Sequence, residues 1–379
     1  MKFVDDARSL NLACAALEGN DVFYLDTEFD SGRDGTRLCL IQIGAGKEVY
    51  VVDALALPDL APLGRLLGGP AQTWVLHAGQ QDIPLLSERL GVGPVRVFDT
   101  QIGWALVSIE HSTSLAYLKY RLLGLRGEKA HQADDWRRRP LPATQLAYAA
   151  DDVVHLPALY RALLEKATRF GRVDTIYEAC AESLIPSVEP SAPLRLDAFR
   201  NAWQLEPEGQ AVLRFLIDWY NALDERDQEA APDIKGLFSI ASRRPKTMDE
   251  LSGLRAVPRR TVNVFGKALV AGIQQAVGRA HTEEFLPIEP PPYATPTELL
   301  ASGWLEAARA ELCTELELAP ELVLPSRVMR RLRDAAVSRG ALSGALDALA
   351  GWRRSLLEAP LSQKLERYGP LTDRKREVD

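Results

Sequence analysis

The chain has 379 residues, of which 46% are hydrophobic and 26% charged, and a formal net charge of −7. Its length exceeds that of one compact core and predicts two or three domains. No run approaches the roughly 18 apolar residues of a membrane span, and the start lacks the basic segment and apolar run of a signal peptide, so we expect a cytoplasmic location. The four cysteines form no CxxC pair, which argues against a zinc knuckle or a disulfide framework.

The first 180 residues alternate β-branched or aromatic runs with helical patterns. The chain starts with a short strand and an amphipathic helix. Further strands are predicted at 22–26, 38–43, 48–53 and 73–78. Helices are predicted at 60–67, 83–90, 100–107 and 114–123, and a long one from Pro142 to about Arg169. This order indicates an α/β domain with a mixed central sheet over residues 1–183.

Two proline-rich linkers divide the rest of the chain, at 184–205 and 282–296. The segments that follow them, 206–281 and 297–370, have leucine and alanine at helical spacing and are predicted to be small all-α domains, with a charged tail at 371–379. Residues 235–267 hold eight basic and two acidic residues, a local balance of 8 − 2 = +6. The negative net charge therefore does not exclude a nucleic-acid partner.

Carboxylates gather at three points of the first domain. Alternation along a strand ending in Asp26-Thr27-Glu28 places both acids on one face. Asp82 opens a helix after the strand at 73–78, where an acid is also common for its interaction with the helix dipole. Tyr148 and Asp152 are spaced i, i+4 and share a helix face, whereas Asp151 points elsewhere. Each signal alone is weak, but together they suit a metal-dependent phosphodiesterase.

The order of DTEF, HAGQQD and YAADD resembles the three exonuclease motifs of the DEDD superfamily, and Tyr-x-x-x-Asp marks its DEDDy branch. The flanking text LCLIQIG, VFDTQIG, SLAYL and EKAHQADDWRRRPL is similar to the ribonuclease D family. The helical remainder looks like two HRDC domains, most clearly in PKTMDELSGLRAVPRRTVNVFGKALVAGI. The resemblance covers the whole chain and implies an α/β ribonuclease H-like exonuclease domain with a mixed central sheet, followed by two small all-α HRDC domains.

The resemblance also implies a two-metal mechanism with Mg²⁺ or Mn²⁺. In that mechanism Asp26 bridges the two ions, Glu28 and Asp152 hold the ion that activates water, and Asp82 holds the other. Tyr148 hydrogen-bonds the attacking water, and its ordinary pKa near 10 makes it a positioner and not a base. The implied activity is removal of nucleoside 5′-monophosphates from RNA 3′ ends, with tRNA precursors as the expected substrates. Neither a membrane nor an obligate protein partner is implied.

Other residues are candidates for substrate contact. The resemblance places Thr27 and Phe29 in the pocket of the terminal nucleotide, although Phe29 also fits a core position. Charged runs are usually solvated, but those before the tyrosine helix and in the first HRDC-like segment are candidates for phosphate contact: Lys129, Arg137, Arg138, Arg139, and then Arg243, Arg244, Lys246, Arg259, Arg260 and Lys267. We expect His77 to be structural or to form the site wall, and Trp136 to be a packing anchor. His155, three residues after Asp152, is a candidate fifth ligand, but we favour a role in helix packing or in supporting the ligands.

Two alternatives stay open at the level of sequence. One is a 3′–5′ exonuclease that acts on DNA, because no residue can be assigned to reading a 2′-hydroxyl. The other is a nucleic-acid-binding protein with a decayed nuclease domain, against which all five motif residues are present. The loop at 30–37 carries two glycines and extra acid where the family has larger residues, which puts nucleotide preference in doubt.

Overall fold

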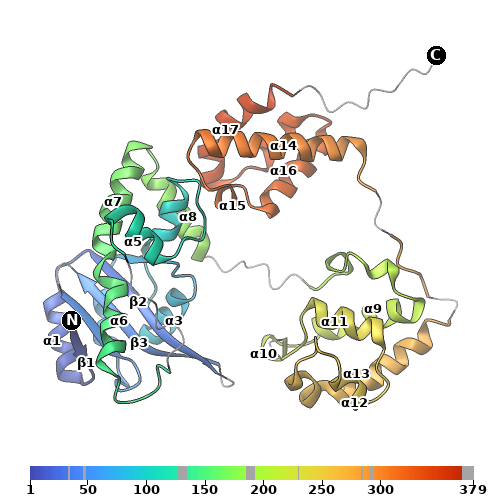
Figure 1. Cartoon of the computed structure of the whole chain (residues 1–379), viewed down its shortest axis with the longest axis horizontal. Helices are drawn as coiled ribbons and strands as arrows, with labels where there is room; N and C mark the ends of the chain where they lie inside the picture. The colour runs from blue at the N-terminus through green and yellow to red at the C-terminus, as the bar shows by residue number, and fades with distance from the viewer. Residues whose placement is uncertain are drawn as a thin grey trace. The chain divides into compact units, whose positions relative to one another are not determined.

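The computed structural model describes residues 1–32, 35–45, 48–126, 135–184, 193–228, 230–282, 285–290 and 293–368. The chain forms two compact units. Unit 1 comprises Met1–Pro186 together with Ala294–Asp379, and unit 2 comprises Ser187–Tyr293 (Figure 1). Each unit has its own hydrophobic core.

The amino-terminal part of unit 1 is an α/β domain built around one sheet. Its strands are β1 (Lys2–Val4), β2 (Val22–Gly32), β3 (Gly35–Ala45), β4 (Glu48–Asp53), β5 (Thr73–Leu76) and β6 (Arg96–Asp99). Its helices are α1 (Ala7–Leu17), α2 (Ala61–Leu67), α3 (Asp82–Leu90), α4 (Thr100–Ala105), α5 (Leu115–Leu123), α6 (Ala143–Val154), α7 (Leu156–Arg169) and α8 (Val173–Leu184).

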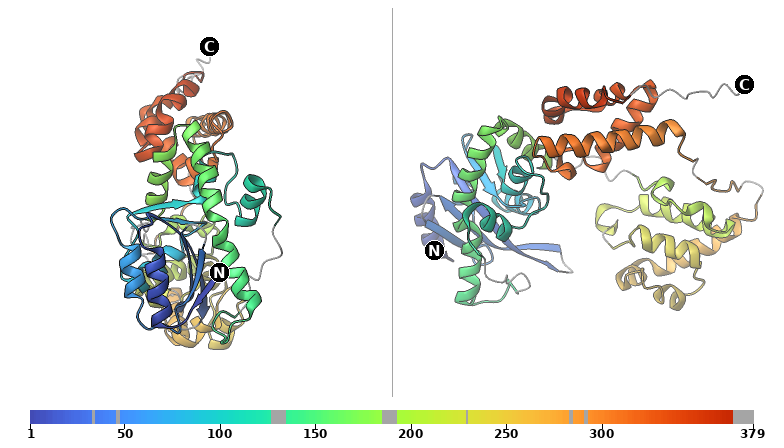
Figure 2. Two further views of the ribbon diagram at one scale, coloured as in Figure 1. Left: turned by 90° about the vertical axis from the view of Figure 1, so that its left-hand side faces the viewer. Right: turned by 45° about the horizontal axis from the view of Figure 1, so that its top comes forward.

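The six strands lie in the order β1-β4-β3-β2-β5-β6. The pairs β4–β3 and β3–β2 are antiparallel and the other three pairs are parallel, which confirms the mixed sheet. Helices α1 and α6 cover opposite faces (Figure 2), and α6 contacts β2, β3 and β4. Strand β6 was not predicted, because this four-residue strand has a run of apolar residues too short for a clear alternation.

The strand that carries the DTEF motif is longer than predicted. We expected it to end at the acidic pair, but β2 continues to Gly32 and pairs with β3 as far as Gly35. A register shift at Glu28/Phe29 interrupts the ladder immediately after the second acid. Such a bulge bends the strand and re-aims the side chains beside it. The acidic pair therefore lies within the strand, at its bend.

The long helix predicted from Pro142 is in fact two helices. Helix α6 ends at Val154, His155 lies between the helices, and α7 begins at Leu156. Pro157 explains the break, because its ring has no N–H to donate and clashes with the carbonyl four residues earlier. Because of the break, α6, which carries Tyr148 and Asp152, packs on the sheet, whereas α7 packs against α4 and α5.

The carboxy-terminal helices also belong to unit 1. They are α14 (Pro296–Glu315), α15 (Pro320–Val323), α16 (Ser326–Arg339) and α17 (Gly351–Leu365), with a 3₁₀ segment at Leu342–Ala348. Their buried residues join those of the α/β domain in one hydrophobic cluster. The backbone N–H of Ala319 donates to the carbonyl of Ala105 at 2.8 Å. The Arg172 guanidinium donates to the carbonyls of Leu106 at 2.9 Å and Leu316 at 2.6 Å.

The described residues of unit 2 contain helices and turns but no strand. Its helices are α9 (Pro207–Asn221), α10 (Glu225–Gln228), α11 (Ile234–Arg243), α12 (Met248–Ser252) and α13 (Arg259–Arg279), preceded by 3₁₀ turns at Leu196–Ala198 and Ala202–Gln204. Helix α9 packs on α11 and α13 around a core that includes Leu213, Ile240 and Leu269. Among the described residues of the whole chain, no helix is both long and apolar enough to cross a membrane.

Candidate active site

Three predicted metal ligands come together between β2 and α6. Carboxylate oxygens of Asp26, Glu28 and Asp152 lie within 4.8 Å of one another. The two acids of β2 reach this point because alternate side chains of a strand share a face. The third comes from α6, which packs across β2 and β3. A strand and a helix far apart in sequence thus build one cluster of three carboxylates.

Asp82 and Thr27 connect this cluster to α3. Asp82 is the first residue of α3, and its carboxylate accepts a hydrogen bond from the hydroxyl of Thr27, which is buried between the two acids of β2. Asp82 is close enough to Asp26 that its negative charge raises the pKa of that residue. Thr27, predicted to contact the terminal nucleotide, thus positions the fourth carboxylate through its side chain.

Helix α6 presents Tyr148 and Asp152 on one face, as the i, i+4 spacing predicts. The Tyr148 hydroxyl donates a hydrogen bond to Asp152. This bond is one of the causes that raise the pKa of Tyr148. The Tyr148 ring stacks on buried Trp136, with ring centroids 6.4 Å apart and planes 27° apart. Stacking restricts the ring, so the hydroxyl is held over the carboxylates. Trp136 thus has the packing role expected of it.

The acids of the site hold their protons unusually tightly. Burial, followed by the charges of Asp82 and Asp152, raises the pKa of Asp26 well above its ordinary value. Burial likewise raises the pKa of Asp82, and it raises the pKa of Asp152 to about 6. These shifts indicate a surplus of negative charge in a protein environment. Hard divalent cations prefer such oxygen ligands, so the residues fit a divalent metal site.

A pocket of about 320 Å³ opens onto these groups. Its lining includes Asp26, Tyr148 and Asp152 on one side and His77 with the 112–115 turn on the other. The His77 ring lies 2.9 Å from the Thr100 hydroxyl and 3.0 Å from the carbonyl of Thr113. Burial lowers the pKa of His77, so its ring is neutral. His77 is therefore a wall residue that fixes the turn, as expected from its position at the end of a strand.

Two buried polar residues beside the carboxylates were not predicted from the sequence. The ammonium group of Lys119, only 7% exposed, pairs with Asp151, and its charge lowers the pKa of neighbouring Asp152. Gln42 lies directly opposite Asp26 in the β2–β3 register, is fully buried, and its amide has no hydrogen-bond partner among the described residues. The available signals were a lysine within an apolar helix face and a glutamine within the apolar run LCLIQI.

His155 is outside the carboxylate cluster. Its ring lies 3.3 Å from the Asp151 carboxylate, at the junction of α6 and α7. This contact agrees with the expected packing role.

The predicted substrate residues differ in their surroundings. Arg139 donates to the Asp53 carboxylate at 2.5 and 2.7 Å and to the Trp136 carbonyl at 2.7 Å. All its nitrogens have protein acceptors, so this geometry does not support the predicted phosphate contact and gives Arg139 a structural role. Arg137 makes a 3.3 Å pair with Asp30 at the surface, and Arg138 is exposed. Phe29 is partly buried beside the β2 bulge, and Lys129 lies outside the described residues.

The basic residues predicted to bind nucleic acid in the first helical segment belong to unit 2. Their exposed members lie at the end of α11, in the connection to α12 and along α13: Arg243, then Lys246, then Arg259, Arg260 and Lys267. Arg244 differs, because it forms ion pairs with Glu206 at 3.1 Å and Glu208 at 3.6 Å.

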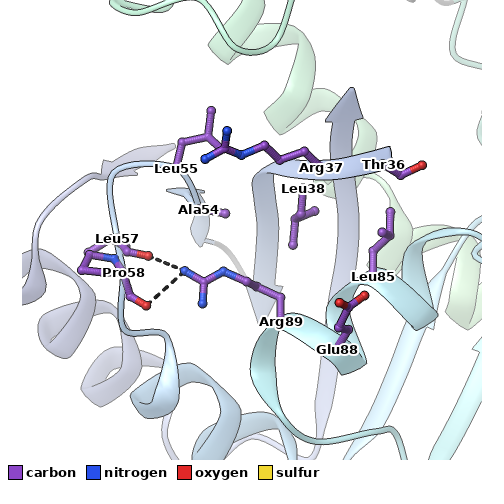
Figure 3. Close-up of a pocket in the computed structure, with 10 residues that line it drawn as sticks. All are labelled: Thr36, Arg37, Leu38, Ala54, Leu55, Leu57, Pro58, Leu85, Glu88 and Arg89. Carbon is purple, nitrogen blue, oxygen red and sulfur yellow. Dashed lines mark hydrogen bonds between the residues drawn. The ribbon is translucent and has the colours of Figure 1, made fainter. Parts of the chain in front are cut away.

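A larger cavity of about 450 Å³ lies apart from the carboxylates, between β3, the turn before α2, and α3. Figure 3 shows the Arg37 and Arg89 guanidiniums and the Glu88 carboxylate around it. Arg89 donates to the carbonyls of Leu57 at 2.6 Å and Pro58 at 3.3 Å, so part of its donor capacity holds the loop. None of the predicted catalytic residues lines this cavity.

Comparison with known proteins places this site in a family. Residues 1–168 match the model of a 3′–5′ exonuclease domain. Ribonuclease D of Pseudomonas paraeruginosa is 31% identical over 377 residues, which cover 97% of this chain and 98% of that one. Ribonuclease D of Gluconacetobacter diazotrophicus is 34% identical over 343 residues, 88% of this chain and 84% of that one.

The chain belongs to the ribonuclease D family. It is therefore a metal-dependent 3′–5′ exoribonuclease, as predicted. A solved relative, ribonuclease D of Escherichia coli, is described as an exoribonuclease involved in structured RNA processing. The structural match with it covers 97% of this chain and 99% of that one, with a TM-score of 0.72 and 26% identity. The likeness extends through the helical segments of this ribonuclease D family member.

Proposed function

We propose that the protein trims the 3′ ends of structured RNA, such as tRNA precursors, with two divalent cations, Mg²⁺ or Mn²⁺. The ligands would be the carboxylates of Asp26, Glu28, Asp82 and Asp152. The observation that carries this proposal is the cluster of three carboxylates within 4.8 Å, extended by Asp82 through Thr27. The chemistry that such cations supply is a lower pKa for water and stabilisation of the charge that develops on the phosphate.

In this proposal Tyr148 orients the attacking water. Burial and three nearby carboxylates raise its pKa, so the hydroxyl keeps its proton at neutral pH and cannot act as the base. The hydroxyl donates a hydrogen bond to Asp152, and a lone pair of a tyrosine oxygen can accept one from water. Trp136 limits the rotation of the ring and so the position of that acceptor. Tyr148 thus fixes the line of approach to the phosphate.

The remaining residues would hold the RNA. Phe29 and the backbone at Thr27 are next to the metal ligands, where the terminal nucleotide must lie. Arg137 and Arg138 are exposed cations next in sequence to Trp136, on which Tyr148 stacks. Phosphate can compete for Arg137 with the half-buried Asp30 and the exposed Asp135, its two carboxylate partners. We also propose that unit 2 and helices α14–α17 are the two HRDC domains, and that the exposed cations of α11 and α13 contact phosphates. A cytoplasmic location stays a prediction.

The test is a cleavage assay with labelled RNA and DNA of the same sequence, in Mg²⁺, Mn²⁺ or EDTA. We expect a ladder from the 3′ end of RNA, release of nucleoside 5′-monophosphates, and no cleavage in EDTA. Asp26→Asn should abolish cleavage, because a neutral amide supplies too little charge to hold a divalent ion. Glu88→Gln is the matched control, since it removes one exposed carboxylate of the same domain outside the pocket.

Other outcomes would change the proposal. If DNA were cleaved in preference to RNA, the proposed substrate would be DNA and not RNA. Tight RNA binding with no cleavage under any metal would favour a binding protein. Substantial activity in Asp26→Asn would mean that the four carboxylates are not the metal site.

A further inference from the structure

Helix α16 carries a strongly basic exposed face of unit 1. Its sequence SRVMRRLRDAAVSR holds five arginines and one aspartate, a balance of 5 − 1 = +4 in a chain whose net charge is −7. Arg327, Arg330 and Arg331 are spaced i, i+3, i+4 and all three are exposed. That spacing places them on one side of the helix. The opposite side, with Val328, Met329 and Leu332, is buried.

The pairing of these arginines sets them apart from others in the same domain. Arg339 is paired with Asp347 at 2.7 Å and Arg354 with Glu358 at 2.9 Å. Among the described residues, neither Arg330 nor Arg331 has an ion pair, and Arg327 has only a 3.7 Å contact with Glu182. The face defined by Arg327, Arg330 and Arg331, here called the α16 arginine face, therefore has excess positive charge directed to solvent.

The charge of the nearby nuclease domain does not neutralise this face. Glu182, on α8, already accepts hydrogen bonds from the Trp352 indole and from Arg353 at 2.6 and 2.7 Å. Arg353 is only 9% exposed, and besides burial the charges of Arg327 and Arg331 lower its pKa. Arg353 and Arg327 thus share one carboxylate, and the positive charge of Arg331 lies near Arg353. Such a cluster attracts an additional anion.

We propose that the α16 arginine face binds the phosphate backbone of RNA upstream of the 3′ end that is cut. Guanidinium groups bind phosphate through two parallel hydrogen bonds, which suits a row of exposed arginines to a phosphodiester chain. The face belongs to the compact unit that holds the carboxylate cluster, because Arg353, Trp352 and Arg172 connect the last helices to the α/β domain. RNA bound there is retained beside the nuclease domain while its 3′ end is shortened.

This inference rests on the proposed RNA substrate, so binding and cleavage are measured separately. Binding of a 5′-labelled RNA hairpin with a single-stranded 3′ tail is followed by fluorescence anisotropy in EDTA, at several salt concentrations. The full-length double variant Arg330→Ala/Arg331→Ala is compared with Arg339→Ala/Arg354→Ala. Both lose two arginine charges from the last helices, but the control arginines are already paired. Equal melting temperatures establish that both variants fold.

We expect the Arg330/Arg331 variant to bind the hairpin roughly tenfold more weakly at low salt. Its plot of log affinity against log salt should be flatter by about 1.4, at about 0.7 for each lost phosphate contact on single strands. Cleavage of a labelled trinucleotide, too short to occupy both places, should be unchanged. Affinity and slope equal to those of the control would overturn the proposal and assign the face to another partner, such as an acidic protein. Absence of RNA cleavage by the wild type would reject the proposed function, while the binding comparison would still decide the role of the face.

Discussion

At the scale of single residues, the shifted acidity of Asp152 links the active site to stability. Its pKa is about 6 in the folded protein, against an ordinary 3.8, mainly because of burial. Between these values the folded state binds a proton that the unfolded state has lost. The contribution of this group to stability therefore decreases as pH rises from about 3.8 to about 6, and the cost persists at higher pH. Holding this carboxylate ionised without metal thus destabilises the fold.

We therefore expect Asp152→Asn to be inactive yet more stable than the wild type without metal at pH 8. The gain should be on the order of 1–3 kcal/mol, a rise of roughly 2–4 °C in Tm per kcal/mol. It should disappear below about pH 4, where the carboxyl is protonated in both states. Thermal unfolding in EDTA at both pH values measures this. A variant that is less stable than the wild type at pH 8 would contradict the assigned cost.

Tyr148 allows positioning of water to be separated from metal binding. Tyr148→Phe keeps the ring that stacks on Trp136 and removes only the hydroxyl. We expect kcat to fall roughly 10²-fold, with the affinity for Mn²⁺ scarcely changed in calorimetry. Tyr120→Phe, which removes an exposed hydroxyl from α5, is the control and should retain full activity. Weaker metal binding in Tyr148→Phe would show that the hydroxyl supports the ligands and does not merely orient water.

At the scale of secondary-structure elements, local patterns predicted most of what positions the site. Alternation placed Asp26 and Glu28 together, and the i, i+4 spacing placed Asp152 beneath Tyr148. Two predicted boundaries were wrong for local reasons. Pro157 divides the predicted long helix, and the β2 bulge lets the strand continue past the acids. The sequence marks Lys119 and Gln42 only as polar residues within apolar runs, because burial of a polar side chain depends on elements distant in sequence.

The docking of the last helices on the α/β domain also depends on tertiary contacts. Arg172 is buried, and besides the Leu106 and Leu316 carbonyls it reaches that of Glu317 at 3.5 Å. Nothing in its sequence context distinguishes it from the exposed arginines nearby. Its three acceptors belong to two segments 316 − 106 = 210 residues apart, so a single guanidinium joins them.

We expect Arg172→Met to loosen this joint by roughly 2–3 kcal/mol, because hydrogen bonds to a charged group are lost and buried carbonyls stay unpaired. Hydrogen–deuterium exchange should accelerate in α14 and α15, while α2 and α3 stay protected. Arg161→Met, which removes an exposed arginine from neighbouring α7, should leave exchange unchanged. Unaltered exchange in α14 and α15 of Arg172→Met would mean that apolar packing alone holds these helices.

At the scale of the whole molecule, the two compact units have separate cores, and only one holds the carboxylates. Separate cores unfold as separate cooperative transitions when few contacts couple them. A ligand that binds one folded unit stabilises that unit alone, by about 2.7 kcal/mol at a hundred times its Kd. A rise in Tm on addition of metal therefore identifies the unfolding transition of unit 1.

We accordingly expect calorimetry to show two unfolding transitions, of which Mn²⁺ raises only that of unit 1, by roughly 5 °C or more. Asp26→Asn should abolish the rise, and Glu88→Gln should retain it, because only the first removes a carboxylate of the cluster. The transition of unit 2 should coincide in all three proteins with and without metal. A single transition, or equal shifts in both, would mean that the units unfold together, and the basic surface of unit 2 would then have to be treated as part of the body that carries the active site.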